Sequence, residues 1–178
     1  MRPSLLLTSF DTWLPHQKSN TSDDLLAQVV QFDSFPQSRS LLRKLPVDSR
    51  LATHLTIDRL EILQPDAIIC CGMAESRQKM MLESQAKRGE TVLQTPFDLN
   101  RLVANLTTTE ISHDAGRFVC NDLYYGILDY INQRQLPIHC LFVHVPVLSD
   151  DNLPQLQSDF LSLCQEIDRR FSKYSHPK

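Results

Sequence analysis

The sequence predicts an α/β fold, specifically a three-layer α/β/α sandwich around a mostly parallel, mixed central sheet. Two observations support this class. Short apolar runs alternate along the 178 residues with segments whose apolar residues recur at the helical period. Several runs are continuously apolar, as expected of parallel strands covered on both faces. No repeat, low-complexity segment or long linker divides the chain, so we expect residues 1–178 to form a single α/β domain.

The first half of the chain supplies three expected strands and two helices. Asn20, Thr21 or Ser22 can accept hydrogen bonds as the cap of the first helix, and Asp48 can cap the second. Pro65 ends the second helix because proline cannot continue it. The expected strands cover residues 4–9, 40–47 and 66–72, and the expected helices cover residues 23–31 and 48–63.

The second half continues the alternation with one ambiguous stretch. Residues 89–106 show no clear period, although Asp98 is a plausible cap for a short helix there. Two strands are expected over residues 79–87 and 137–145, one helix over residues 118–133, and a last helix starting at residues 152–154. Ligands of such sheets bind beyond the carboxyl ends of the strands, which directs attention to residues 9–13, 72–77 and 144–146.

Composition and charge exclude several classes of function. The four glycines form neither GxGxxG nor GxxxxGK[ST], which argues against dinucleotide and P-loop sites. The net charge is −3 and no long Lys/Arg cluster occurs, so we expect no nucleic-acid partner. No apolar run is long enough for a signal peptide or a membrane span. We therefore expect a cytoplasmic protein that does not bind membranes.

The five cysteines have no metal-binding spacing. They form no CxxC pair, and most of them lie within apolar stretches. In a reducing compartment they are free thiols, and four of them are expected to fill the core. We predict no metal site and no cofactor. The five are Cys70, Cys71, Cys120, Cys140 and Cys164.

Three residues are candidates for catalysis, and each has a plain structural alternative. Cys120 falls at or just inside a helix start, where the dipole lowers a thiol pKa and N–H groups can hold an oxyanion; it could equally be a small core residue. His144 ends an apolar strand and could act as a general base, or be a buried histidine with satisfied hydrogen bonds. Glu83 lies among apolar residues and could orient an imidazole, or point to solvent.

Five segments together resemble the pyroglutamyl peptidase type I (pyrrolidone carboxyl peptidase) family, in that family's chain order. The resemblance covers nearly the whole chain, and its most specific part is the helix-start cysteine followed downstream by His-Val-Pro. The segments are TSFDTW (8–13), GMAESR (72–77), LE (82–83), AGRFVCN (115–121) and VHVP (143–146).

The resemblance implies an α/β/α fold and a cysteine peptidase that removes N-terminal pyroglutamate from peptides without a cofactor. It implies Cys120 as nucleophile, His144 as general acid–base and Glu83 as orienting carboxylate. It also implies that aromatic side chains hold the lactam ring, a flat group that packs well on aromatic faces. The implied substrate-binding residues are Phe10, Trp13, Met73, Phe118 and Val119. The oligomeric state stays open, a homo-oligomer included.

The chain departs from the family pattern around the expected pocket. Met73 stands where a substrate-binding glutamine is usual, and Glu75-Ser76 replaces two glycines. A segment that contributes to the pocket in relatives is largely absent between Gly89 and Phe97. An alternative is therefore a weak or inactive member that acts as a binding or regulatory protein through this shortened loop. A phosphorylase-like or nucleosidase-like enzyme is a further alternative, with Arg77 as its single anion-binding candidate.

Overall fold

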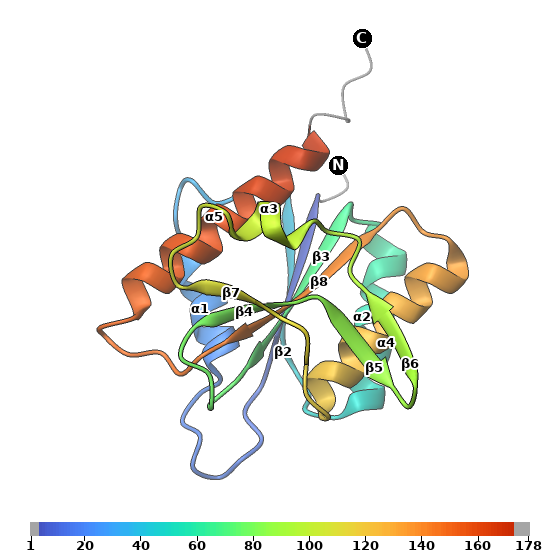
Figure 1. Ribbon diagram of the computed structural model, residues 1–178, viewed down its shortest axis with the longest axis horizontal. Coiled ribbons are helices and arrows are strands. Elements are labelled where there is room, and N and C mark those ends of the chain that lie inside the picture. Colours follow the sequence, from blue (N-terminus) through green and yellow to red (C-terminus); the bar gives the residue numbers. More distant parts are fainter. Residues whose placement is uncertain (1–3, 173–178) are drawn as a thin grey trace.

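The computed structural model describes residues 4–172 and contains a six-stranded sheet between two layers of helices (Figure 1). The strand order is β2-β1-β3-β8-β4-β7. The first four of these strands run parallel, and β4 pairs antiparallel with β8 and parallel with β7. The sheet strands are β1 (Leu5–Phe10), β2 (Arg39–Leu45), β3 (Ala67–Met73), β4 (Met80–Glu83), β7 (Thr109–Ser112) and β8 (His139–Val145).

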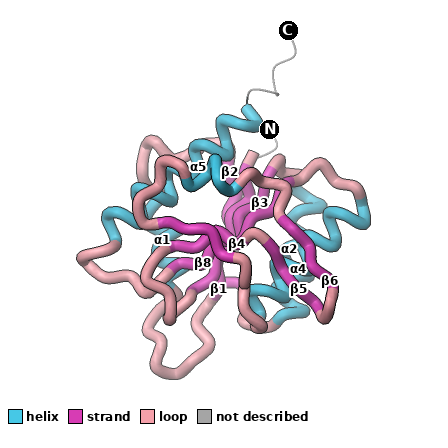
Figure 2. The backbone as a smooth tube through the Cα atoms, viewed as in Figure 1, coloured by secondary structure: helices cyan, strands magenta, loops and turns pink. Residues whose placement is uncertain are grey.

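The helices cover both faces of this sheet, so the predicted three-layer α/β/α sandwich is confirmed (Figure 2). Helices α1 and α5, with the short α3, lie on one face, and α2 and α4 lie on the other (Figure 1). The helices are α1 (Thr21–Val29), α2 (Ser49–Leu63), α3 (Leu99–Val103), α4 (Val119–Arg134) and α5 (Leu153–Ser172). Among the described residues no helix is both long and apolar enough to cross a membrane.

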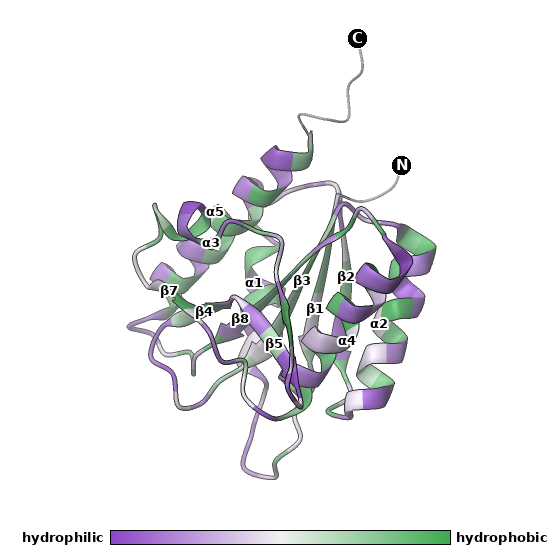
Figure 3. Cartoon of the chain, turned by 45° about the vertical axis from the view of Figure 1, so that its right-hand side comes forward, coloured by the Kyte–Doolittle hydropathy of each residue, from purple (hydrophilic) through white to green (hydrophobic). Residues whose placement is uncertain are grey.

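Alternate residues of each central strand enter different apolar clusters. Leu5 and Leu7 of β1 face α1 and α5, whereas Leu6 and Phe10 face α2 and α4. This period of two is what a strand with two covered faces requires. Figure 3 shows the central strands as largely apolar and the helices around them as mixed in hydropathy.

The N-cap residues of three helices are among those predicted from the sequence. Asn20 accepts a hydrogen bond from the Ser22 N–H, Asp48 from the Leu51 N–H and Asp98 from the Arg101 N–H, as predicted. Each cap satisfies an N–H group that the helix itself cannot pair. The helix starts could therefore be located within about two residues.

The strand predicted over residues 79–87 is wrong, because these residues form two strands in different sheets. Residues 79–87 were expected to be continuous, but the chain changes sheets at Ser84. Strand β4 ends at Glu83, and Gln85–Arg88 forms β5, which pairs with β6 (Thr91–Gln94) in a separate hairpin. The Ser84 N–H donates to the Ser112 carbonyl, and the Thr95 N–H donates to the Ser84 carbonyl, so the backbone remains paired where it turns.

Candidate active site

The sheet register brings the predicted residues of three strands to one face. Gly72 of β3 lies opposite His144 of β8, and Glu83 of β4 lies opposite Phe142, two residues before His144. Residues that are opposite in register point to the same face, as do residues two apart in one strand. Because Phe142 belongs to the apolar cluster beneath α2 and α4, His144 and Glu83 point to this face as well.

Glu83 and His144 form a buried pair. His144 Nδ1 lies 2.7 Å from Glu83 Oε1, and both residues are almost fully excluded from solvent. A carboxylate only accepts hydrogen bonds, so a neutral imidazole paired with it carries its proton on Nδ1. The lone pair of Nε2 is then free to accept a proton. The structure thus rules out the alternative in which Glu83 points to solvent.

The backbone behind this pair is also fixed. The Tyr124 hydroxyl of α4 donates to the Glu83 carbonyl at 2.9 Å, which ties the end of β4 to the helix above it. Glu83 Oε2, in contrast, is buried and has no hydrogen-bond partner among the described residues. The carboxylate therefore directs its one hydrogen bond at the imidazole, the arrangement that orients a general base.

Cys120 is the second residue of α4 and sits directly above Gly72. A Cβ atom added to Gly72 would lie 2.7 Å from Cys120 Sγ and 2.8 Å from Phe142 Cζ. Only glycine, which has no side chain, leaves room for the thiol at this position. We call Gly72 the seat of the Cys120 thiol. Since Gly72 is also the register partner of His144, the seat places Cys120 next to the Glu83–His144 pair.

The electrostatics of Cys120 differ from the sequence expectation. A position in the first turn of a helix was expected to lower the thiol pKa. Burial, which disfavours the charged thiolate, instead raises the pKa of Cys120 to about 12, with Cys70 and Glu83 adding to the rise. The backbone N–H of Cys120 itself acts in the opposite direction and is too weak to reverse it. In the free protein the thiol is therefore neutral near pH 7 and needs a base to activate it.

The start of α4 offers backbone donors beside the thiol. Phe118 is the N-cap residue, and its side chain makes no capping hydrogen bond. The first N–H groups of the helix consequently lack a side-chain acceptor. Groups of this kind can hold the negative oxygen that develops when a thiolate attacks a carbonyl carbon.

A cavity of about 690 Å³ opens above these residues. Trp13, Met73, Phe118 and Val119 line it together with Cys120 and His144, so six of the eight predicted site residues share one cavity. Trp13 and Phe118 are 58% and 75% exposed, which leaves their aromatic faces open to a ligand. Glu83 lies behind His144 and does not line the cavity.

The structure places Phe10 away from this cavity. The sequence interpretation paired Phe10 with Trp13 on the loop after the first strand, but β1 runs one residue further than expected and includes Phe10. Its side chain consequently points into the cluster beneath α2 and α4 and is 2% exposed. In this position Phe10 packs the core beneath the loop and does not line the cavity.

Two polar side chains that the sequence analysis did not list among the site residues hold the cavity rim. The Gln17 amide donates to Glu75 Oε1 at 2.8 Å, and Gln17 Oε1 accepts from the Trp13 N–H at 3.1 Å. These bonds tie the loop after β1 to the loop after β3. The sequence feature that could have indicated these rim contacts is Glu75, because it stands where the resembled family has glycine.

The shortened segment forms the β5–β6 hairpin. Gly89 turns it with a φ of 59°, a conformation that glycine adopts readily. Asn121 anchors the hairpin to α4 by accepting from the Lys87 N–H at 2.9 Å and donating to the Lys87 carbonyl at 2.8 Å. No residue between Gly89 and Phe97 lines the cavity described above. The five cysteines are free, and the described residues contain no group of His, Cys, Asp and Glu suited to a metal ion.

Comparisons with known proteins find similarity to one group of proteins. A sequence model of the pyroglutamyl peptidase family matches residues 99–170, which include Cys120 and His144. Pyrrolidone-carboxylate peptidase 1 of Caldanaerobacter subterraneus subsp. tengcongensis is 24% identical over 92% of both chains. The pyrrolidone-carboxylate peptidase of Brachyspira hyodysenteriae is 28% identical over 96% of this chain and 98% of its own. That alignment spans 201 positions against a chain of 178 residues, so this chain has internal gaps relative to it.

Solved structures show the same fold. The crystal structure of pyroglutamyl peptidase I from Bacillus amyloliquefaciens superposes with a TM-score of 0.82 at 20% identity, covering 95% of this chain and 98% of that one. The pyrrolidone carboxyl peptidase from Thermococcus litoralis gives a TM-score of 0.77 at 17% identity over 99% and 97% of the two chains.

Fold and site together define an α/β protein with a cysteine, a histidine and a carboxylate of the kind that cysteine hydrolases use. The family match and the curated relatives make the similarity more specific. In sequence and in fold the chain is similar to the pyroglutamyl peptidase family.

Proposed function

We propose that the protein is a cysteine peptidase that hydrolyses the bond after an N-terminal pyroglutamyl residue of a peptide. One observation carries this proposal: Cys120 is seated on Gly72, beside a histidine whose other nitrogen is held by a buried carboxylate. The names of its relatives supply the substrate class, since they are called pyrrolidone-carboxylate peptidases. The free cysteines fit a reducing compartment and support a cytoplasmic location.

The first half of the proposed reaction forms an acyl-enzyme. His144 Nε2 takes the thiol proton of Cys120 as Sγ attacks the pyroglutamyl carbonyl carbon. Glu83 stabilises the imidazolium that results, and N–H groups at the start of α4 hold the oxyanion. When the C–N bond breaks, the imidazolium gives its proton to the leaving amine. The shortened peptide departs, and pyroglutamate remains as a thioester on Cys120.

The second half releases the acid. His144 Nε2 accepts a proton from water, whose oxygen attacks the thioester carbonyl. The C–S bond breaks, pyroglutamate leaves, and the proton returns to the Cys120 sulfur. No redox step or external co-reactant is needed. Because the pKa of Cys120 is raised to about 12, the proton must be transferred to His144 during the attack, and a stable thiolate before substrate binding is not expected.

The exposed aromatic rings of Trp13 and Phe118 supply the proposed faces for the lactam ring, and Met73 and Val119 line the same cavity. A pyroglutamyl residue at the N-terminus of a peptide has no free amino group and carries no charge. The apolar part of the cavity, formed by Trp13, Met73, Phe118 and Val119, suits an uncharged residue of this kind.

The proposal is tested with a pyroglutamyl 7-amido-coumarin substrate, whose hydrolysis releases a fluorophore. We expect turnover by the wild-type protein and a loss of at least about 10³-fold in Cys120→Ala. Cys164→Ala, which removes a buried thiol on the other face of the sheet, is the matched control and should keep the rate. No release by the wild-type protein between pH 6 and 9, with pyroglutamate still bound, would favour a binding or regulatory protein.

A further inference from the structure

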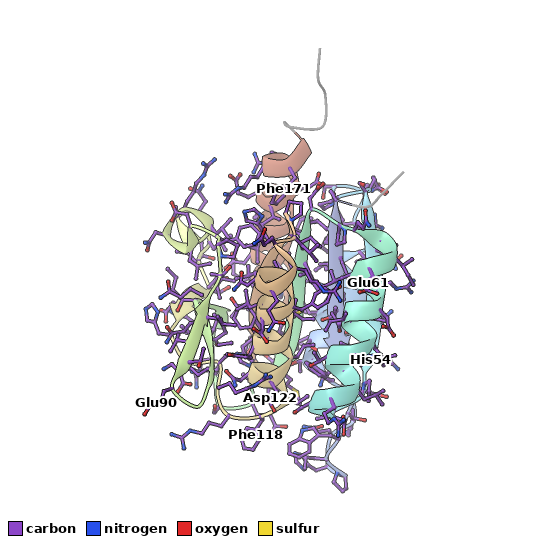
Figure 4. All side chains as sticks on the ribbon, turned by 90° about the vertical axis from the view of Figure 1, so that its right-hand side faces the viewer. His54, Glu61, Glu90, Phe118, Asp122 and Phe171 are labelled. Atoms are coloured by element: carbon purple, nitrogen blue, oxygen red, sulfur yellow. The ribbon has the colours of Figure 1, made fainter. Side chains whose placement is uncertain are left out.

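A second, open groove lies beside the candidate site. It has a volume of about 900 Å³ and runs between the first half of α2, the start of α4 and the end of β5. Figure 4 shows His54 of α2 and Asp122 of α4 on the face that contains it, with Phe118 close to Asp122 at the start of α4. Neither the proposed reaction nor the binding of the lactam ring uses this groove.

The groove is continuous with the cavity above Cys120. Ser49 and Asp122 line both of them, and the Ser49 hydroxyl donates to Asp122 Oδ2 at 2.6 Å. This hydrogen-bonded pair forms the boundary that the two spaces share. A peptide whose first residue occupies the cavity can therefore extend past the pair into the groove.

The charged groups that line the groove differ in whether they already have a polar partner. Asp48 caps α2 through the Leu51 N–H, and Asp122 accepts from Ser49, so each carboxylate already has a partner. Arg50 and Arg88, in contrast, form no ion pair within residues 4–172, and both are exposed. The Arg88 guanidinium lies over the Tyr125 ring, 4.1 Å from its centroid, which holds the side chain at the groove.

Apolar surface lies beside these cations. Leu51 is 47% exposed and lines the groove together with the partly buried Ile57. A groove with exposed aliphatic side chains and two unpaired guanidinium groups suits an extended peptide that carries a carboxylate.

We propose that this groove binds the part of the substrate that follows the scissile bond, and that Arg50 and Arg88 favour a carboxylate there. The carboxylate is either an acidic side chain or the C-terminus of a short peptide. This inference rests on the proposed peptidase function and extends it, because it assigns a binding region and a charge preference to the leaving peptide.

The test compares kcat/KM for matched pyroglutamyl peptides. One set has Glu, Gln or Lys at the second or third residue after the scissile bond, and a second set has a free or an amidated C-terminus. The pyroglutamyl coumarin substrate, which has no peptide beyond the bond, is the internal reference. We expect the wild-type protein to favour Glu over Lys, or the free over the amidated terminus, by about twofold to fivefold, the size that exposed ion pairs produce.

Reversing the charge of each arginine then tests whether it causes the preference for a carboxylate. Arg50→Glu and Arg88→Glu should each reduce or invert the preference when rates are divided by the coumarin rate. Arg134→Glu, at the other end of α4, is the matched control and should keep it. Added salt should weaken the preference in the wild-type protein because it screens exposed charges.

The outcomes separate the two proposals. One outcome is turnover of the coumarin substrate with equal rates for Glu, Gln and Lys peptides and for both C-termini. It would overturn the proposed role of the groove and leave the peptidase proposal standing. A preference that survives both charge reversals would also overturn the role of Arg50 and Arg88. A protein that releases pyroglutamate from no substrate would overturn both proposals.

Discussion

The floor of the cavity and its rim are built by different means. The floor consists of Gly72, Glu83, Cys120 and His144, which lie on three strands and a helix and are fixed by sheet register, burial and a short hydrogen bond. The rim consists of the exposed loops that carry Trp13, Glu75 and Phe118, held by few hydrogen bonds. The difference indicates that the chemistry of this protein is determined by its core, whereas substrate recognition is determined by segments that can change without unfolding it.

The largest expected effect lies in the floor. Glu83→Gln keeps a hydrogen-bond acceptor for His144 Nδ1–H but removes the negative charge that stabilises the imidazolium. We expect kcat to fall by about 10²–10⁴-fold, as loss of an orienting carboxylate does in related chemistry. Steady-state kinetics with the coumarin substrate measure this effect, and circular dichroism checks the fold. A Glu83→Gln variant with wild-type kcat would show that the carboxylate only fills space.

The second prediction tests the seat of the thiol. In Gly72→Ala the new Cβ would overlap Cys120 Sγ and the Phe142 ring, so the thiol must move. A displacement of about 1 Å can cost about 10²-fold in rate, and we expect a loss of that size in kcat. The measurement is kcat together with the urea midpoint.

Gly126→Ala provides a matched control for this prediction. Its new Cβ would lie 2.7 Å from Thr53 Cγ2 between α4 and α2, an overlap as close as the one at Gly72 but outside the floor. We expect Gly126→Ala to change stability and to leave kcat for the coumarin substrate intact. If both glycine variants lose activity in proportion to their stability, Gly72 has no special role.

The third prediction contrasts two aromatic residues, Phe10 and Trp13, which are three positions apart in the chain but lie in the core and on the cavity rim respectively. Trp13→Ala should raise KM about tenfold with little change in stability, because the ring is exposed on the rim. Phe10→Leu should lower the urea midpoint, by about 1 kcal/mol in unfolding free energy, and leave KM unchanged, because the ring is buried in the core. A KM effect in Phe10→Leu matching that of Trp13→Ala would restore the sequence interpretation.

The smallest effect concerns alkaline stability. Burial raises the pKa of Cys120 to about 12 from a reference value of 9.0, so the folded state keeps its proton where the unfolded state loses it. Stability from this group is complete below pH 9 and falls as the pH rises from 9 towards 12. We expect the urea midpoint to decrease between pH 8 and pH 10, and to decrease less in Cys120→Ala. Identical pH slopes for the two proteins would contradict the shift.

The sequence predicted the regular part of the fold well because local signals determine it. The caps at Asn20, Asp48 and Asp98, and the apolar runs of β3 and β8, identify elements without knowledge of their neighbours. Strand β7 (Thr109–Ser112) was not predicted, since its four residues alternate without a marked apolar run. It is a strand because β4 pairs with it, and such pairing is a tertiary effect.

The sequence predicted the catalytic residue types of the candidate site. It predicted neither the pKa of Cys120 nor which aromatic residues line the cavity. Cys120, His144 and Glu83 could be singled out by residue type, position and resemblance. The raised pKa of Cys120 depends on burial of its thiol between the start of α4 and the sheet, and the location of Phe10 depends on a strand end shifted by one residue. One residue reverses the direction of a strand side chain, so this error is of the kind that period-two patterns produce.

The seat beneath Cys120 also limits which reagents can modify this protein. Gly72 lies directly under the sulfur and the Phe142 ring lies beside it, so an electrophile has to approach from the cavity. We expect small, flat acylating agents that fit between Trp13 and Phe118 to label Cys120, and bulky maleimides to label it slowly. The other four cysteines are buried in the core, so such a label would report on this one position.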